Sequence, residues 1–177
     1  LQPMVDRWNP IIWDIVKGDP KLFAMTKAFM WVESAGRQFA VSHTGCSGLM
    51  QFCAGTARRE PYRSIFGFGE IYVCGCTGTR CRVSKEVQRA METGGPEALS
   101  AHEDEFPCDL TDARFNAERS IRAGALYVEK LARPFGDNIY LMYIGYNSGP
   151  GVARRIWRKT GKRSDIDLKT VQGALIN

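Results

Sequence analysis

The sequence contains no long hydrophobic run. Its longest apolar stretches, at residues 22–25 and 28–32, are far too short to span a bilayer. The start lacks the charged, apolar and small-residue pattern of a signal peptide, although a first residue of Leu1 rather than Met is compatible with removal of an N-terminal segment. Internal repeats and low-complexity tracts are also absent. We therefore expect a globular protein without a membrane span.

The composition is ordinary for a globular protein. Apolar residues make up 44% of the 177 residues and charged residues 24%, which excludes wholesale disorder. The length predicts one domain, or one domain with an insertion. A chain of this size buries roughly 70% of the surface that its unfolded form exposes, so its core does not need disulfides.

The chain is basic, with 24 Lys and Arg against 19 Asp and Glu, a net charge of +5 and a pI of about 9.0. This charge is compatible with nucleic acid, an anionic membrane or an anionic cell wall as partner. No nucleic-acid signature accompanies it, so we expect no nucleic-acid partner. The densest group of cations is either a solvated helix face or a patch that faces a polyanion. It comprises Arg154, Arg155, Arg158, Lys159, Lys162 and Arg163.

Six cysteines indicate disulfides, and hence an oxidising compartment that is periplasmic or extracellular. The alternative is a zinc site built from the group between residues 74 and 81 together with Cys108. That group lacks the usual C-x-x-C spacing, and its Gly and Thr residues are typical of turns. We therefore favour disulfides and expect no metal and no other cofactor. The cysteines are Cys46, Cys53, Cys74, Cys76, Cys81 and Cys108.

Helical periodicity dominates the chain. Asp19 is a good N-cap, Pro20 suits the first helical position, and apolar side chains then recur at helical steps up to a stop at Gly36. Further helices are predicted at about 48–59, 113–132, 138–147 and from 152 onward. The segment 60–111 is predicted to be a Cys-rich insertion, irregular or with a small β element at about 66–73. The expected fold class is mainly α, with residues 1–177 in one domain.

Glu33 is the main candidate for catalysis. It lies near the end of an apolar helix, in line with Leu22 and Phe29. A carboxyl group on such a face is desolvated, which raises its pKa and favours the protonated form that a general acid needs. The alternative is a helix-terminal Glu that reaches solvent or pairs with Arg37.

Four short motifs follow one another along the chain. They are Glu-Ser at 33–34, Gly-Leu-Met-Gln at 48–51, Gly-Ala-Leu-Tyr at 124–127 and Tyr-Asn-Ser-Gly at 146–149. Each motif alone is weak, but their order and spacing resemble the lytic transglycosylase family, which is related to goose-type lysozyme. The resemblance covers about residues 20–157, interrupted by the Cys-rich stretch. It implies a helical, two-lobed, lysozyme-like domain with a substrate groove.

The resemblance also implies roles for residues of these motifs. Glu33 would be the single catalytic residue of a peptidoglycan lytic transglycosylase. It would protonate the glycosidic oxygen between N-acetylmuramic acid and N-acetylglucosamine. It would then take the proton of the muramic acid C6 hydroxyl, whose attack leaves a 1,6-anhydro end. The residues implied in substrate binding are Ser34, Gly48, Leu49, Met50, Gln51, Tyr127, Tyr146 and Asn147.

Each of these roles has a structural alternative. Ser34 could be a helix-terminal Ser bonded to backbone, Leu49 and Met50 could be ordinary core, and Tyr127 could be a packing residue. In the family role, Gln51 binds sugar hydroxyl and acetamido groups, and Met50 offers a soft surface to a sugar face.

Three departures from the family pattern stand out. Ser120 replaces the Asn that usually precedes Ile, which predicts the loss of one polar contact. Gly145 replaces the Ala before Tyr-Asn. Cys46 and Cys53 flank the Gly-Leu-Met-Gln motif, and we expect them to anchor it to the insertion, with Cys108 as a candidate partner.

Other functions fit the same residues. A hydrolase of the goose-lysozyme type needs a second carboxylate to place water, and the carboxylates of the insertion match no family motif and are typical of surface charges. A non-catalytic peptidoglycan-binding protein and a Cys-rich metal-binding module are the remaining alternatives. We expect a monomeric transglycosylase acting on glycan strands; a phage or a secretion system is a possible source. The carboxylates of the insertion are Glu70, Glu103, Asp104, Glu105 and Asp109.

Overall fold

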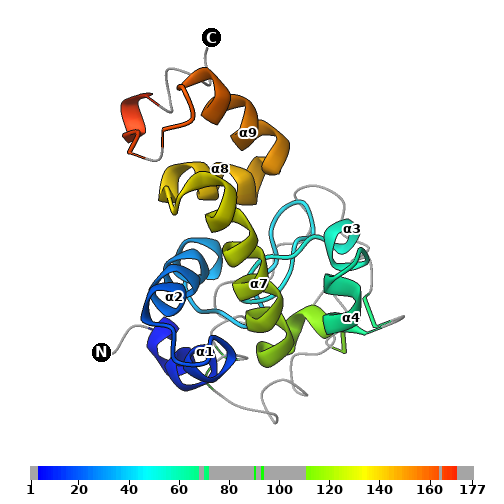
Figure 1. Cartoon of the computed structure of the whole chain (residues 1–177). Coiled ribbons are helices and arrows are strands. Elements are labelled where there is room, and N and C mark those ends of the chain that lie inside the picture. The colour runs from blue at the N-terminus through cyan, green and yellow to red at the C-terminus, as the bar shows by residue number, and fades with distance from the viewer. Residues whose placement is uncertain are drawn as a thin grey trace. The chain divides into compact units, whose positions relative to one another are not determined.

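The computed structural model describes residues 4–67, 70–71, 90, 93, 111–163 and 165–170. This part of the chain is mainly helical (Figure 1), which confirms the predicted lysozyme-like class. The helices in chain order are η1 (Met4–Trp8), α1 (Asn9–Ile15), α2 (Pro20–Ser34), α3 (Ala54–Ala57), α4 (Tyr62–Phe66), η4 (Ala113–Phe115), α7 (Ala117–Phe135), α8 (Ile139–Ser148) and α9 (Pro150–Lys159).

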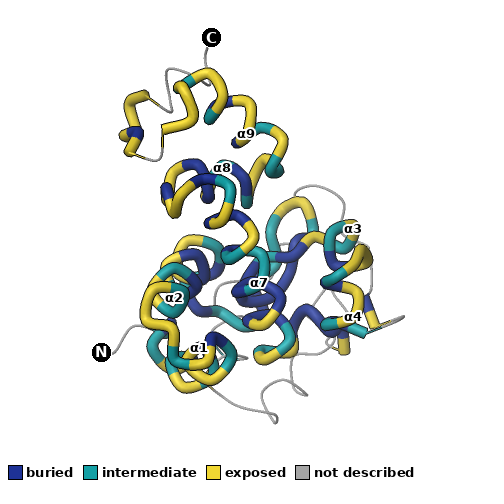
Figure 2. The backbone as a smooth tube through the Cα atoms, in the orientation of Figure 1, coloured by how far each residue is buried: buried dark blue, intermediate teal, exposed yellow. Residues whose placement is uncertain are grey.

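The chain divides into two compact units, Leu1–Gly124 and Ala125–Asn177, with the boundary inside α7. The expectation of a single domain over residues 1–177 stays a prediction. The core of the first unit takes its side chains from α2, from the loop that precedes α3 and from the start of α7 (Figure 2). Its most deeply buried apolar residues include Phe29, Met30, Leu49, Met50, Phe66, Phe115 and Ile121.

Helix α2 begins and ends where the sequence predicts. The Asp19 carboxylate accepts hydrogen bonds from the backbone N–H groups of Lys21 and Leu22, at 2.9 and 3.0 Å. At the other end, Ala35 adopts the left-handed conformation and Gly36 has φ +80°. A Cβ atom at Gly36 would lie 2.6 Å from the backbone of Val5, so only glycine fits at this stop.

The segment before α2 forms two helices that the sequence analysis did not predict. In η1 and α1, Val5, Trp8 and Ile12 are buried. The indole N–H of Trp8 donates to the carbonyl of Gly36 at 2.8 Å, so this segment packs at the C-terminal end of α2.

The predicted helix at 48–59 is wrong. Residues 48–51 form a turn, and α3 covers only Ala54–Ala57. The reason is backbone conformation, since Gly48 and Gln51 have φ values of +84° and +49°, which a right-handed helix excludes. The β structure of the described residues consists of the bridges Val41–Ser47 and Ser47–Phe52.

Of the predicted insertion, the structure describes residues 60–67, 70–71, 90, 93 and 111. Phe66 ends α4 rather than opening a strand, and half of the expected β element at 66–73 lies outside the described residues. The same is true of Cys74, Cys76, Cys81 and Cys108.

The second unit consists of the end of α7 with α8 and α9. Helix α7 begins later than predicted, at Ala117, because η4 takes up residues 113–115, and it continues past residue 132 to Phe135 with Pro134 inside it. Asn138 caps α8 by accepting from the N–H of Leu141 at 3.0 Å. Helix α9 begins at Pro150, close to the predicted start. Leu141, Met142, Ala153 and Ile156 form the apolar contact surfaces of α8 and α9.

Candidate active site

Glu33 is the penultimate residue of α2. Its side chain is half-buried, and its Oε1 atom is buried. The preceding residues Phe29 and Met30 are buried, whereas Trp31 and Val32 are 52% and 57% exposed. Glu33 therefore lies at the margin between the core and the surface, where a carboxyl group can be partly desolvated and still meet a substrate.

Ser34 follows Glu33 and is bonded to the backbone. Its hydroxyl donates to the carbonyl of Met30 at 3.2 Å and accepts from the N–H of Gly36 at 3.1 Å. The residue is only 1% exposed. Ser34 is thus a helix-terminal Ser bonded to backbone, as in the structural alternative to a binding role. Its role in substrate binding stays a prediction.

The turn at 48–51 packs against the loop that follows α2. The N–H of Gly48 donates to the carbonyl of Ala40 at 2.9 Å. The Gln51 amide nitrogen donates to the carbonyls of Ala40 and Gly48, both at 2.9 Å. Because these bonds use the amide N–H groups, Gln51 would bind a sugar through its Oε1 atom, which accepts hydrogen bonds.

Leu49 and Met50 are fully buried. Met50 lies against α7, where a Cβ atom at Gly124 would come within 2.5 Å of its side chain. The Gly of the Gly-Ala-Leu-Tyr motif thus makes room for Met50. The expected surface for a sugar face is therefore not provided by Met50 in this structure, and both residues act as core beneath the turn.

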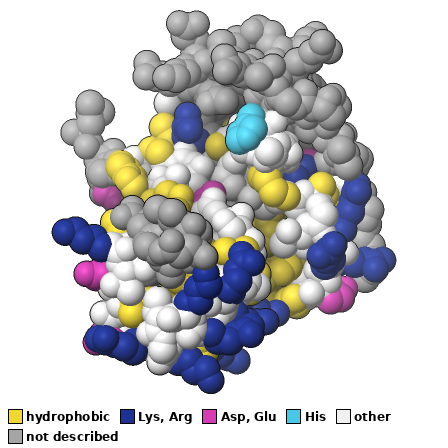
Figure 3. Space-filling view, turned by 90° about the horizontal axis from the view of Figure 1, so that it is seen from above, with side chains coloured by type: hydrophobic (Ala, Val, Ile, Leu, Met, Phe, Trp, Pro, Cys, Tyr) yellow, Lys and Arg dark blue, Asp and Glu magenta, His cyan; other side chains and the backbone are white. Residues whose placement is uncertain are grey.

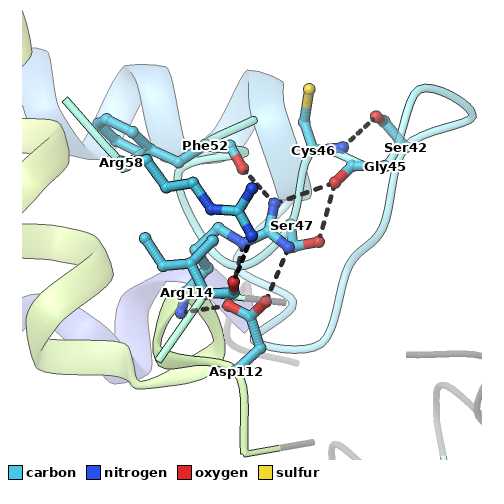
Figure 4. A network of polar contacts seen from close by, with 9 residues as sticks. Ser42, Gly45, Cys46, Ser47, Phe52, Arg58, Asp112 and Arg114 are labelled. Carbon is cyan, nitrogen blue, oxygen red and sulfur yellow. Dashed lines mark hydrogen bonds and ion pairs between the residues drawn. The ribbon is translucent and has the colours of Figure 1, made fainter. Parts of the chain in front are cut away.

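Arg114 holds the loop that carries this turn, and the sequence analysis missed it. Its side chain is 1% exposed and forms a bidentate ion pair with Asp112, at 2.9 Å from Nε and 2.8 Å from Nη2. Its Nη1 donates to the carbonyls of Gly45 and Phe52, both at 3.1 Å (Figure 4). One buried guanidinium therefore joins the two ends of the loop.

The backbone of Arg114 also touches the turn. A Cβ atom at Gly48 would lie 1.9 Å from the Arg114 carbonyl oxygen. The backbone of Arg114 thus approaches Gly48 closely, which only glycine permits at this position. The only sequence signal for this residue is the spacing Asp112-Ala113-Arg114, which is common on protein surfaces and gives no reason to expect burial.

The predicted aromatic residues lie in the second unit. The rings of Tyr127 and Tyr146 are 4.9 Å apart between centroids. The Tyr127 hydroxyl donates to the carbonyl of Gly145 at 3.1 Å, and burial raises the pKa of Tyr127 above its usual value. Asn147 is exposed, and its amide donates to the carbonyl of Tyr143 at 3.2 Å. Tyr127, Tyr146 and Asn147 thus form one group on α7 and α8.

A family model described as the transglycosylase SLT domain matches residues 19–69 and 96–169. The two ranges cover more than half of the chain. The chain belongs to the transglycosylase SLT domain family. The predicted membership of the lytic transglycosylase family is thereby confirmed, and the interval left unmatched, 70–95, lies within the predicted insertion. The search among curated proteins gives no match.

In this transglycosylase SLT domain, Ser120, which stands where the family usually has Asn, still makes a polar contact. The N–H of Met50 donates to its Oγ at 3.2 Å, and Ser120 is fully buried. The turn is therefore bonded both to Ser120 on α7 and to Ala40 in the loop after α2. At Gly145 a Cβ atom would lie 2.7 Å from Cδ2 of Leu131, so an alanine here would require the Leu131 side chain to shift.

The disulfide of the SLT domain differs from the expected one. Cys46 is bonded to Cys53, so neither is anchored to Cys108. The bond closes the same loop that Arg114 spans, and it supports the predicted use of cysteines in an oxidising compartment. Among the described residues, no group of three or more His, Cys, Asp and Glu is placed to hold a metal ion. None of the helices in this part of the chain is long and apolar enough to cross a membrane.

A cleft of about 450 Å³ lies elsewhere in the first unit of the SLT domain. Its lining includes the ion pair of Glu70 and Arg119 and the aromatic residues Phe39 and Phe115. None of the residues expected to bind substrate lines it.

Proposed function

We propose that the protein is a peptidoglycan lytic transglycosylase. It would cleave the β-1,4 bond between N-acetylmuramic acid and N-acetylglucosamine and leave 1,6-anhydro-muramic acid ends. The observation that carries this proposal is the SLT domain match, which spans all four motifs and includes Glu33 with its buried carboxyl oxygen. The proposed location is periplasmic or extracellular, which the disulfide supports.

Glu33 would act first as acid and then as base. Its Oε1 atom is buried, and the residue stands in the last turn of α2, at the negative end of the helix dipole. A protonated carboxylic acid can give its proton to the leaving glycosidic oxygen. The resulting carboxylate can then accept the proton of the C6 hydroxyl as that oxygen attacks the anomeric carbon. Glu33 ends protonated, so one residue completes the cycle.

Three other motif residues, Gln51, Tyr146 and Asn147, would bind the glycan strand. In the first unit, the acceptor oxygen of Gln51 would receive a sugar hydroxyl or acetamido N–H, at a turn held by Arg114 and Ser120. In the second unit, Tyr146 and Asn147 would contact sugar directly. Tyr127 would set the position of Tyr146 through their ring contact.

A hydrolytic outcome would need a second carboxylate to place water. Of the carboxylates weighed for this role, Glu70 is engaged by Arg119. Glu103, Asp104, Glu105 and Asp109 lie outside the described residues. The transglycosylase reaction needs no water, so it is the proposal that the assigned residues can perform alone.

Mass spectrometry of the products from purified peptidoglycan tests the reaction. We expect anhydro-muropeptides, whereas reducing-end sugars alone would show a hydrolase. Glu33→Gln should lower the rate by at least about 1,000-fold, because the acid and the base are lost together. The circular dichroism spectrum should not change. Full activity of Glu33→Gln would refute the assignment of this residue, and retained wall binding without any activity of the wild type would indicate a non-catalytic binding protein.

A further inference from the structure

The net charge of the chain belongs to one of its two units. Ala125–Asn177 contains nine Lys and Arg against four Asp and Glu, a net charge of +5. Leu1–Gly124 contains 15 of each kind and is neutral. The excess charge of the whole chain, +5, therefore resides in its last 53 residues.

Most of this charge lies on one surface. Helix α9 contains four cations and no Asp or Glu, and a fifth cation follows just after its end. All five are exposed, whereas Ala153 and Ile156 on the other side of the helix are buried. Figure 3 shows Lys and Arg side chains gathered closely on the face that it views. The five residues, called here the basic face, are Arg154, Arg155, Arg158, Lys159 and Lys162.

The arginines of α7 provide a comparison within the same protein, because their charges are already paired with glutamates. Arg119, Arg122 and Arg133 each form an ion pair with a glutamate: Glu70, Glu118 and Glu129 respectively.

The basic face has no such pairs among the described residues. The nearest acid in the sequence, Asp165, is bound by Arg163, which is not part of the face. Like charges four residues apart repel each other on a helix, and α9 contains two such pairs. They are Arg154 with Arg158 and Arg155 with Lys159. An anionic partner would relieve this repulsion.

We propose that the basic face binds the carboxylate groups on the peptide stems of the cell-wall polymer that the protein cleaves. This proposal rests on the proposed function for the identity of the polymer. Cations four residues apart recur about every 6 Å along a helix, an arrangement that suits a polymer with repeated anions better than one small ligand. Guanidinium groups bind carboxylates in bidentate fashion, and three of the five residues are Arg. The contact would hold the second unit on the wall.

Single-stranded nucleic acid is less well matched by this surface. Its binding proteins combine cations with exposed aromatic rings on which bases stack. The aromatic residue of α9, Trp157, is half-buried, and its indole nitrogen is buried. The basic face thus offers charge without a stacking surface.

Co-sedimentation with insoluble peptidoglycan, stripped of attached polymers, tests the proposal. The Glu33→Gln background prevents digestion during the assay. Adding Arg154→Gln and Arg158→Gln should weaken binding about five- to ten-fold at 0.15 M salt, as expected for two lost ion pairs. The matched control is Arg122→Gln with Arg133→Gln, which changes the net charge equally but removes paired cations of α7. It should change binding less than two-fold.

Two further measurements identify the partner group. Amidation of the peptide-stem carboxylates should abolish the difference between the basic-face variant and its control. Raising the salt to 1 M, where the Debye length is about 3 Å, should do the same. Three outcomes would overturn the proposal. The two variants could bind equally well, the protein could be retained on peptidoglycan only where phosphate polymers remain attached, or it could prefer nucleic acid. Failure of the proposed function would show separately, as an absence of anhydro products from a wild type that still binds carboxylated walls.

Discussion

Arginine serves two opposite purposes in this chain. Arg114 is buried, and its ion pair with Asp112 and two carbonyl contacts hold the loop beside the proposed catalytic helix. The arginines of the basic face are exposed, and no described acid pairs with them. A buried charge must be fully bonded because its removal from water is costly, whereas an exposed charge remains available to a partner. Arg114 is therefore expected to matter for folding, and the arginines of the basic face for binding.

The largest effect on stability is expected from Arg114→Met. It should lower the free energy of unfolding by about 3–5 kcal/mol, because Asp112 would remain buried without its guanidinium. Urea denaturation followed by circular dichroism measures this change. Arg122→Met is the control: it breaks an exposed pair with Glu118 and should change stability by about 0.5 kcal/mol or less. Similar values for the two variants would remove the contrast between buried and exposed arginines.

A smaller loss is expected when the disulfide of the same loop is removed. Cys46→Ser with Cys53→Ser should lower the free energy of unfolding by about 2–3 kcal/mol, since the bond closes only a short loop in the unfolded chain. The same urea experiment applies. Thr44→Ala, at an exposed position just before this loop, should change stability by less than about 0.5 kcal/mol. No loss in the double variant would mean that Arg114 alone keeps the loop closed.

A pH-dependent effect is expected at Tyr127. Its pKa is raised by burial, so the folded state binds the phenolic proton more tightly than the unfolded state. This contribution to stability is complete below the unfolded pKa of 10.0 and is lost as the pH rises further, towards the folded pKa. Tyr127→Phe should lower stability by about 1 kcal/mol at neutral pH, through loss of the bond to Gly145, and should reduce the decline above pH 10.

Thermal unfolding between pH 7 and 11 measures this effect. Tyr140→Phe, at a ring that is 39% exposed, serves as the control. The same alkaline decline in wild type and Tyr127→Phe would show that another group is responsible.

The smallest change is expected from the basic face. Arg154→Gln with Arg158→Gln should leave the free energy of unfolding unchanged or raise it by a few tenths of a kcal/mol at low salt, because a like-charge pair disappears. A loss above about 1 kcal/mol would show that these arginines, like Arg114, are structural residues. It would weaken the proposal that the basic face binds peptide-stem carboxylates.

The helices could be predicted where their determinants are local. Asp19 with Pro20 at one end of α2 and Gly36 at the other are adjacent in sequence to the elements that they bound. The turn at 48–51 could not be predicted in the same way, because Arg114 and Ser120, far along the chain, hold it. A run that contains Leu49, Met50 and Phe52 has the same apolar pattern whether it forms a helix or lines a core.

The candidate site shows the same division. The motif order identified the family and drew attention to Glu33, whose place on a helix with an apolar face follows from periodicity. The motif match could not reveal that Ser34 bonds to backbone, that Met50 is core, or that Cys46 pairs with Cys53. These outcomes depend on three-dimensional neighbours, and a short motif does not encode them.

The contact between Trp8 and Gly36 has a practical consequence for anyone who shortens this protein. The family match begins at residue 19, so a domain cut to that boundary would discard η1 and α1. Those helices place a tryptophan and a backbone segment directly against the glycine that ends α2, three residues after Glu33. Such a fragment would expose the end of the helix that presents the proposed acid. A minimal catalytic fragment should therefore begin no later than Met4.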